Sequence, residues 1–313
     1  MKIIKKYLRY IFLKIGGWEY IEKNLILKGI ILSKKNKNIN KIQNLKDIEF
    51  SVFSQWGEDG IIDWLVQKIP IVNKTFLEIG TQDYKESNSR FLLISKNWKG
   101  FVIDRSSADV KAIKSQSIYW KFNLSAFKFF INKKNINEII KKIKIKKKIG
   151  LLSLDIDGND YWILKEIKNL QPDIIVCEYN AVFGNAYEIT VPYNKNFERT
   201  KFHYSNLAYG ASLPAFIALL KKKNYTFIGT NSNGVNAFFV KKDKFKYIKK
   251  KITNIKSFNS KLRESKDKFG SKTFISGEKR TKKIDNINVL NIKKNKMVKI
   301  KNLKNFNIKN WKN

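Results

Sequence analysis

The chain has 313 residues, of which 64 are Lys or Arg and 26 are Asp or Glu, and its formal net charge is +38. A hydrophobic content of 43% supports a sizeable core and excludes a wholly disordered chain. A single cysteine, Cys177, cannot form an internal disulfide, and a single histidine, His203, excludes a metal site built from several histidines. Because reduced, cysteine-poor chains are typical of the cytoplasm, we expect a cytoplasmic protein.

The positive charge is concentrated in the two terminal segments. Residues 1–48 hold 12 basic and 3 acidic side chains, and residues 241–313 hold 25 and 5. Only 6 basic residues are Arg, the side chain suited to bidentate contacts with bases and phosphates, so nucleic acid is a disfavoured partner. Lys, Asn and Ile all have AT-rich codons, which makes genome composition the simpler explanation of the Lys excess. A peripheral contact of the basic segments with the anionic inner face of a membrane stays open.

The N-terminal segment has a helical pattern but no membrane-spanning run. No stretch of 18 apolar residues occurs in the sequence, so we predict no transmembrane helix. The helix either lies in a membrane interface or packs on the main domain, and both interpretations stay open. Residues 33–48 are predicted to be a polar linker. The helix is predicted because large apolar residues recur at helical spacing, namely Ile3, Ile4, Tyr7, Leu8, Ile11 and Phe12.

Residues 49–240 alternate between apolar, β-branched runs and helical patterns. This alternation is typical of a parallel sheet covered on both faces. The predicted strands lie at residues 74–79, 100–104, 118–122, 150–155 and 173–178, and the predicted helices between them lie at residues 133–148 and 162–170.

The end of this segment has a different pattern. Ser212 and Pro214 begin a predicted helix that runs to about Lys223. Two further apolar runs then flank Asn233 and Gly234, a pair that signals a hairpin turn. Five parallel strands closed by a helix and a hairpin are the pattern of class I methyltransferases. We therefore predict an α/β, Rossmann-like fold with a mostly parallel seven-stranded sheet and a C-terminal antiparallel hairpin.

The predicted organisation has three parts. Residues 1–48 form a basic helix and linker, and residues 49–240 form the methyltransferase-like domain. Residues 241–313 are a basic extension rich in Lys and Asn, which we predict to be partly disordered, with weak strands within residues 287–298.

Acidic residues and a glycine follow the first two predicted strands. Glu78, Gly80 and Asp83 stand at the end of the first strand, and Asp104 ends the second. In doubly wound sheets these strand ends form the crevice where ligands bind. A glycine lets the backbone approach a cofactor, and a carboxylate can accept both hydroxyls of a ribose. One glycine is too few for the dinucleotide motif, so the pattern predicts a nucleoside cofactor other than NAD.

A second polar group follows the fourth and fifth predicted strands. Asp155, Asp157 and Asp160 come after the fourth strand, and Glu178 and Asn180 end the fifth. Clustered carboxylates repel one another unless a proton, a metal or a substrate hydroxyl intervenes. Two interpretations stay open. One is a Mg²⁺ site of Asp155, Glu178 and Asn180, which resembles the arrangement in Mg-dependent catechol-type methyltransferases; the other is a metal-free group that binds the acceptor.

Residues 181–210 show no clear element. Loops of this length inside a compact domain are commonly lids or binding loops. Since this loop follows the fifth strand, it should overhang the crevice. It contains His203, a candidate general base for an acceptor hydroxyl; the alternative is a histidine that orders the loop.

Three stretches resemble FkbM-type methyltransferases. Residues 54–62 (SQWGEDGII) are similar to the family's SQ-x-GQD helix. Residues 76–104 are similar to its first-strand segment, with motif positions at Glu78, Gly80, Asp83, Ser87, Asn88, Trp98, Gly100 and Asp104. Residues 151–165 resemble its Asp-x-Glu-Gly-x-Glu motif at Asp155, Asp157, Gly158 and Asp160. The resemblance covers residues 54–240 and leaves both terminal segments uncovered.

The resemblance implies S-adenosylmethionine as the cofactor and methyl transfer to an oxygen. It places Asp155 and Asp157 at the methyl-transfer site. The sequence departs from the family where Thr81 and Gln82 make the cofactor loop bulkier and where Asp157 replaces Glu. The cofactor-binding residues that it implies are Gln55, Glu78, Gly80, Asp83, Asn88 and Asp104.

We therefore expect an O-methyltransferase acting on a hydroxyl of a sugar, a glycan or another small molecule. Two alternatives stay open. The charge suggests a nucleic-acid methyltransferase, and the terminal segments suggest a non-catalytic module that binds a membrane or a glycolipid.

Overall fold

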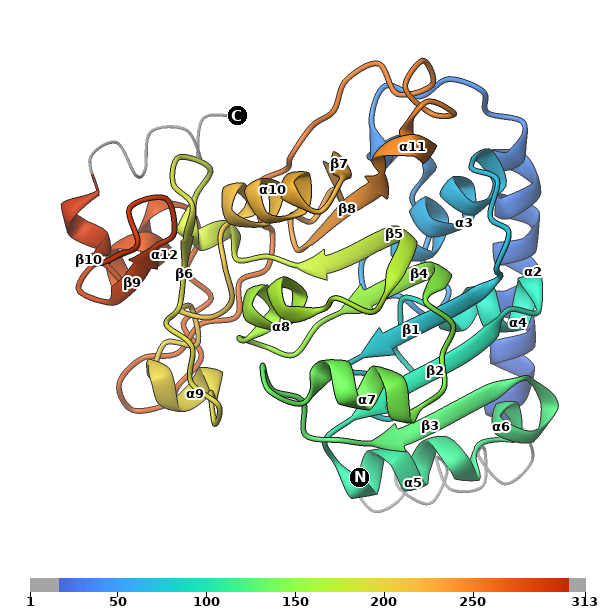
Figure 1. Cartoon of the computed structure of the whole chain (residues 1–313), viewed down its shortest axis with the longest axis horizontal. Coiled ribbons are helices and arrows are strands. Elements are labelled where there is room, and N and C mark those ends of the chain that lie inside the picture. Colours follow the sequence, from blue (N-terminus) through green and yellow to red (C-terminus); the bar gives the residue numbers. More distant parts are fainter. Residues whose placement is uncertain (1–16, 304–313) are drawn as a thin grey trace, which may run out of the picture.

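A seven-stranded sheet forms the centre of the molecule (Figure 1). The computed structural model describes residues 17–303, so the helix predicted around Ile3–Phe12 lies outside the described residues. The sheet has the order β3-β2-β1-β4-β5-β8-β7. Its strands are β1 (Thr75–Ile79), β2 (Lys99–Asp104), β3 (Leu124–Lys128), β4 (Lys148–Leu154), β5 (Gln171–Glu178), β7 (Tyr225–Thr230) and β8 (Asn236–Lys241).

The strand directions confirm the predicted fold class. The first five strands pair in parallel, whereas β8 runs antiparallel to both β5 and β7. This is the order and direction of the class I methyltransferase sheet. The hairpin turn follows the sequence signal, because Gly234 has a positive φ of 63° and the Asn231 side chain accepts hydrogen bonds from the backbone of Val235 and Asn236.

Helices cover both faces of the sheet, as the continuous apolar strands require. In β1, for example, all five residues are buried, and Phe76 and Leu77 point into different hydrophobic clusters. One face is covered by α7 (Ile136–Lys142), α8 (Asp160–Glu166) and α10 (Leu213–Lys222). The other is covered by α3 (Glu58–Lys68), α4 (Arg90–Lys96), α5 (Ser107–Ser115) and α6 (Ser117–Lys121).

The third strand was predicted at the wrong place. Residues 117–121 form α6, and β3 begins later, at Leu124. The aromatic run that suggested a strand is only partly buried: Ile118 packs in the core, whereas the Trp120 side chain is 77% exposed. The predicted helix at 133–148 is also shorter, because α7 spans only Ile136–Lys142 and Lys144, with a positive φ of 53°, leaves the helical path before β4 begins at Lys148.

The segment predicted as a polar linker packs on the domain. Helix α2 (Gly17–Lys37) continues into it, and the short 3-10 helix η1 (Leu45–Ile48) follows. Ile42, Leu45 and Ile48 are buried in the same hydrophobic cluster as Ile248 and Ile252 from beyond β8. One hydrophobic core therefore contains residues from all three predicted parts of the chain.

The structure describes residues 241–303 of the C-terminal extension, and the partial disorder expected for residues 241–313 stays a prediction. The extension contains α11 (Lys242–Phe245), α12 (Glu278–Lys283), η3 (Ile300–Asn302), β9 (Asn288–Asn291) and β10 (Lys296–Lys299). The weak strands predicted within residues 287–298 correspond to β9 and β10.

β9 and β10 belong to a second, three-stranded sheet, and the loop after β5 supplies its third strand. β9 pairs with both β10 and β6 (Ile189–Thr190). Ile284, Val289 and Ile300 are buried against residues of the same loop, which also contains η2 (Ala181–Phe183) and α9 (Arg199–Phe202). Among the helices in residues 17–303, none combines the length and apolar character needed to cross a bilayer.

Candidate active site

A cavity of about 550 Å³ opens at the carboxyl ends of β1, β2 and β4. Gly80, Asp104 and Asp155 line it from these three strand ends. The loop predicted to overhang the crevice does so, since residues 195 and 197–200 from it also line the cavity. Figure 1 shows the strands pointing toward the side of the molecule that carries α9.

Gly80 brings the ends of β1 and β4 together. Its φ is +85°, and a Cβ atom built at this position would lie 1.6 Å from the carbonyl oxygen of Asp155. No larger residue fits without moving the backbone of one strand. The glycine therefore fixes the floor of the cavity.

Asp104 lies at the end of β2, where the sequence predicts a ribose-binding carboxylate. Its two oxygens accept hydrogen bonds from the backbone nitrogens of Gln82 and Ser106, at 2.9 and 2.8 Å. A carboxylate has about four lone-pair positions, so both oxygens can accept further hydrogen bonds from the cavity side. The backbone contacts hold the carboxylate in one orientation.

Glu78 is buried and does not line the cavity. Its carboxylate accepts hydrogen bonds from the Ser87 hydroxyl and from the backbone nitrogens of Asn88 and Ser89. Burial raises the pKa of Glu78, and these hydrogen bonds oppose that shift. Asn88 in turn donates to the Ser153 hydroxyl at 3.1 Å. In this structure Glu78 shapes the loop between β1 and α4, and its contact with a cofactor stays a prediction.

Asp83 and Gln55 also lie outside the cavity lining. Asp83 forms a 3.0 Å ion pair with Lys85, and the Gln55 side chain is exposed. Burial raises the pKa of Asp83, but the hydrogen bonds and charge of Lys85 outweigh it, so the net shift is downward. Their predicted cofactor contacts are untested.

Three carboxylates come together at the ends of β4 and β5. Asp155, Asp157 and Glu178 each offer an oxygen within 4.8 Å of the other two. Burial raises the pKa of Asp155 and of Glu178 well above the ordinary range, and repulsion from neighbouring carboxylates adds to both shifts. Such a pair holds a proton more readily than an isolated carboxylate does.

Asn180 makes its hydrogen bonds within the loop after β5, and its predicted role as a metal ligand stays a prediction. Its amide nitrogen donates to the carbonyl oxygens of Leu207 and Tyr209, and its Oδ1 accepts from the backbone of Val182. The side chain therefore anchors the loop after β5. Asp157 is the third carboxylate beside Asp155 and Glu178.

Asp160 holds the backbone of the loop that carries Asp157. It is buried, and its oxygens accept hydrogen bonds from the backbone nitrogens of Ile156 and Gly158. Burial raises the pKa of Asp160 to about 6, against the effect of these hydrogen bonds. Its contacts set the path of the β4–α8 loop that carries Asp157.

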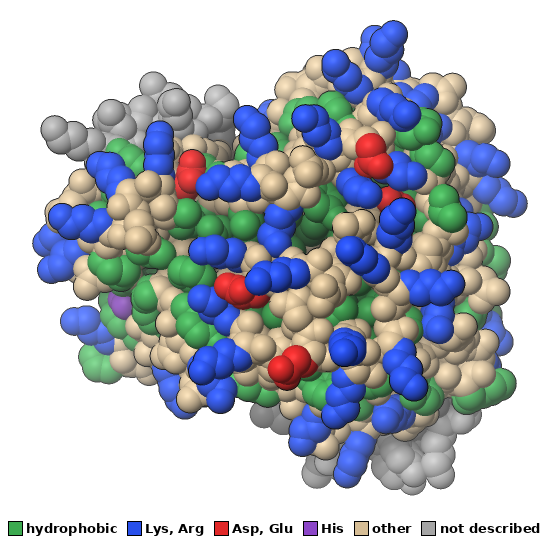
Figure 2. Space-filling model, in the orientation of Figure 1, with side chains coloured by type: hydrophobic (Ala, Val, Ile, Leu, Met, Phe, Trp, Pro, Cys, Tyr) green, Lys and Arg blue, Asp and Glu red, His purple; other side chains and the backbone are tan. Residues whose placement is uncertain are grey.

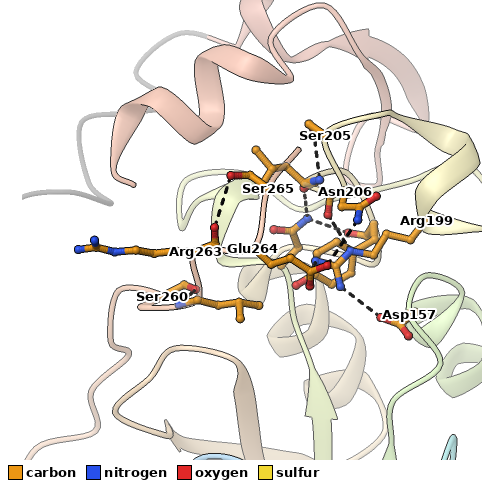
Figure 3. Close-up of polar contacts among 12 residues, drawn as sticks. Asp157, Arg199, Ser205, Asn206, Ser260, Arg263, Glu264 and Ser265 are labelled. Carbon is orange, nitrogen blue, oxygen red and sulfur yellow. Dashed lines mark hydrogen bonds and ion pairs between the residues drawn. The ribbon is translucent and has the colours of Figure 1, made fainter. Parts of the chain in front are cut away.

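Arg199 is the cation beside the acidic group (Figure 3). From α9, its guanidinium forms a 3.2 Å ion pair with Asp157 and lies 4.0 Å from Glu264 of the C-terminal extension. Its Nε donates to the carbonyl oxygen of Asn206, and its plane lies 3.8 Å from the Tyr209 ring centre. Tyr209 donates to Glu178 at 3.3 Å, which links the guanidinium and the buried carboxylate through one ring.

His203 lies outside the cavity lining, so the structure gives the predicted base no contact with the acidic group. Its Nδ1 lies 2.7 Å from the Ser205 hydroxyl, and its ring packs on Tyr204 at 4.3 Å. Burial and the charge of Lys283 lower its pKa. The contacts with Ser205 and Tyr204 lie within its own loop, and the role of His203 as a base stays a prediction.

Three residues at the site have no role predicted from the sequence: Arg199, Tyr209 and Glu264. The same holds for Phe129 and Phe130, which form an aromatic wall of the cavity. One signal for Arg199 was available, because a rare Arg in a loop beside clustered acids is a candidate ion-pair partner. Glu264 had no such signal, since it lies in a low-complexity segment far along the chain.

The chain matches no family model and no curated protein by sequence. Its structure is similar to that of an S-adenosylmethionine-dependent methyltransferase from Clostridium acetobutylicum, with 11% identity, a TM-score of 0.38, and coverage of 59% of this chain and 90% of that one. It is also similar to the N-terminal domain of EvdMO1 with SAH bound, with 8% identity, a TM-score of 0.38, and coverage of 66% of this chain and 93% of that one. A third similar structure is a Methanococcus jannaschii fibrillarin, with 9% identity, a TM-score of 0.37, and coverage of 54% of this chain and 67% of that one. At these scores the likenesses carry no argument about activity.

Proposed function

We propose that the protein is an S-adenosylmethionine-dependent O-methyltransferase of FkbM type. The observation that carries this proposal is the cavity at the carboxyl ends of β1, β2 and β4, in a sheet of class I order, with Gly80 and Asp104 in its lining. A volume of about 550 Å³ is in the range of sites for ligands of nucleoside size. Asp104 suits the ribose hydroxyls, and the aromatic wall of Phe129 and Phe130 suits a purine face.

The acidic group at the ends of β4 and β5 suits the binding and deprotonation of the methyl acceptor. When bound, S-adenosylmethionine supplies an electrophilic methyl group. Asp155, which lines the cavity, would orient an acceptor hydroxyl by accepting its hydrogen bond and would take its proton. Glu178 is buried beside it and does not line the cavity. The raised pKa of Asp155 favours this role, because a carboxylate that binds its proton more tightly is a stronger base.

The acceptor that fits best is a neutral compound with several hydroxyl groups, such as a sugar. Carboxylate oxygens accept hydrogen bonds from hydroxyls but repel phosphates. The Phe197 ring, which packs over Gly158, adds an apolar surface to the same cavity. A nucleic acid would meet this acidic group with its charged backbone, which disfavours the alternative that the net charge suggests.

Calorimetric titration with S-adenosylmethionine tests the proposal. The wild-type protein is expected to bind one equivalent, and Asp104→Asn is expected to weaken binding by roughly tenfold or more, since one charge-assisted acceptor is lost. Asp109→Asn is the matched control, because Asp109 also lines the cavity but follows the strand end by five residues. The absence of binding by wild-type protein, or equal effects of the two variants, would contradict the proposal.

A further inference from the structure

Helix α2 has one face packed on the domain and one face without cover among the described residues. On the packed face, Glu22 forms a 2.6 Å ion pair with Arg90, and a Cβ on Gly29 would collide with the side chains of Val52 and Phe91. Ser33 is also buried there. These contacts fix the rotation of the helix and so decide which residues face outward.

Large apolar side chains occupy the outward face. Tyr20, Leu27 and Ile31 are 71%, 58% and 65% exposed. Their spacing of seven and four residues places them on one stripe of the helix. Exposed apolar residues are common singly, but a stripe of three along one helix indicates a surface that becomes covered.

Lysines flank the stripe on both sides. Helical geometry places Lys23 and Lys34 along one flank and Lys28 and Lys35 along the other, and all four are exposed. Residues 1–16, which precede the helix, contribute five further basic residues and no acid. A partner must therefore accept apolar side chains along a line and carry negative charge on both sides of it.

The positive surface continues beyond the helix. Ser33 of α2 accepts a hydrogen bond from Lys96, and the next residue, Asn97, lines a hollow of about 410 Å³. The hollow lies at the amino ends of the strands and contains no acidic residue in its lining. Its basic lining residues are Lys74, Lys99, Lys144 and Lys146.

Charge decides between the possible partners. A second copy of this chain carries a net charge of +38, and the preceding residues 1–16 are also basic, so neither complements the lysine flanks. Nucleic acid would pair with the lysines but would leave the apolar stripe in water. Lys and Arg side chains are scattered over the whole face shown in Figure 2, so positive charge alone does not single out one surface there. A bilayer with anionic lipids complements both features.

We propose that the outward face of α2 docks on an anionic membrane surface, with Tyr20, Leu27 and Ile31 in the interface and the flanking lysines against lipid phosphates. The helix lies at the side of the molecule where the strands begin, whereas the cavity lies where they end (Figure 1). The docked protein therefore keeps its cavity open to solvent. This proposal does not depend on the proposed methyl transfer.

Co-sedimentation of the full chain with vesicles tests the proposal. We expect binding to phosphatidylcholine vesicles that contain phosphatidylglycerol and not to phosphatidylcholine alone. The double variant Leu27→Glu and Ile31→Glu should weaken binding by roughly tenfold or more. Phe269→Glu is the control, because Phe269 is an apolar residue of the C-terminal extension that is 93% exposed. Binding of the double variant at wild-type strength would overturn the proposal.

Two sets of four lysine changes with equal charge distinguish docking through α2 from a general attraction of the basic protein to anionic vesicles. Changing Lys23, Lys28, Lys34 and Lys35 to Glu should weaken vesicle binding by roughly fivefold per lysine. The control changes four exposed lysines on the opposite face, and it should have a much smaller effect. Equal losses in the two sets, or a dimer in sedimentation velocity that the Leu27 and Ile31 changes dissociate without vesicles, would overturn the proposal. The control lysines are Lys165, Lys168, Lys221 and Lys222.

Discussion

Asp155 and Glu178 come from the ends of two neighbouring parallel strands, and each has a carboxylate oxygen within 4.8 Å of the other. Burial raises both pKa values; repulsion from Asp155 adds to the shift of Glu178, whereas repulsion from Asp157 and Asp160 adds to that of Asp155. The sequence places Asp155 and Glu178 at strand ends, but their pairing across the sheet depends on the register between β4 and β5.

Asp155→Asn is expected to lower the rate of methyl transfer by roughly 100-fold or more while leaving the affinity for S-adenosylmethionine largely unchanged. The amide keeps the shape of the side chain but cannot take a proton. Release of S-adenosylhomocysteine with a panel of sugar acceptors measures the rate. Because the pKa of Asp155 is raised, wild-type activity should increase with pH until the carboxylate is deprotonated. Glu198→Gln, on an exposed residue of the same cavity, should retain activity and the same pH profile.

Arg199→Met is expected to strengthen divalent-cation binding at Asp155, Asp157 and Glu178. The guanidinium now neutralises Asp157, and its removal leaves three adjacent carboxylates without a cation. Mn²⁺ binding followed by electron paramagnetic resonance measures the change. Lys195→Met removes another cation from the cavity lining without touching this group and should leave Mn²⁺ binding at wild-type strength. Stoichiometric Mn²⁺ binding by wild-type protein, with activity lost on chelation, would support the Mg²⁺ interpretation.

Asp59→Asn is expected to stabilise the fold increasingly as the pH rises. Burial raises the pKa of Asp59 to about 7, although the backbone nitrogens of Val52, Phe53 and Ser54 donate to it. The folded state thus binds this proton more tightly than the unfolded chain, so wild-type stability falls as the pH rises from about 4 to about 7.

Urea unfolding at several pH values measures this effect. The stability difference between Asp59→Asn and wild type should grow by roughly 1 kcal/mol per pH unit between pH 5 and 7 and level off above that. Asp243→Asn, at an exposed position, should show no such trend. A constant difference across this range would contradict the assignment.

Gly80→Ala is expected to destabilise the fold by more than about 3 kcal/mol or to prevent folding, because its Cβ would overlap the Asp155 carbonyl. Gly210→Ala separates this clash from backbone strain. Gly210 also has a positive φ, of 59°, but has open space around its Cβ position, so its cost should be about 1 kcal/mol. Thermal and urea unfolding compare the two. Equal losses would show that the close approach of β1 and β4 does not matter for stability.

Much of the fold could be predicted from local patterns. Continuous apolar strands, the cap of α10 at Ser212 and the Asn-Gly turn each depend on neighbouring residues, and the structure confirms all three. The prediction was wrong at residues 118–122, where the pattern was aromatic and the structure has a helix. In the C-terminal extension the low-complexity pattern gave no signal for the buried contacts with the loop after β5, which depend on distant segments.

The candidate site divides in the same way. The sequence by itself determined that acids follow β1, β2, β4 and β5, because strand periodicity and residue type are local properties. Only the tertiary structure decided that Glu78 and Asn180 are used within the fold, that Asp157 joins Asp155 and Glu178, and that Arg199 and Glu264 meet beside them. Such pairings depend on strand register and on loops that return from far along the chain, where no local spacing fixes a distance.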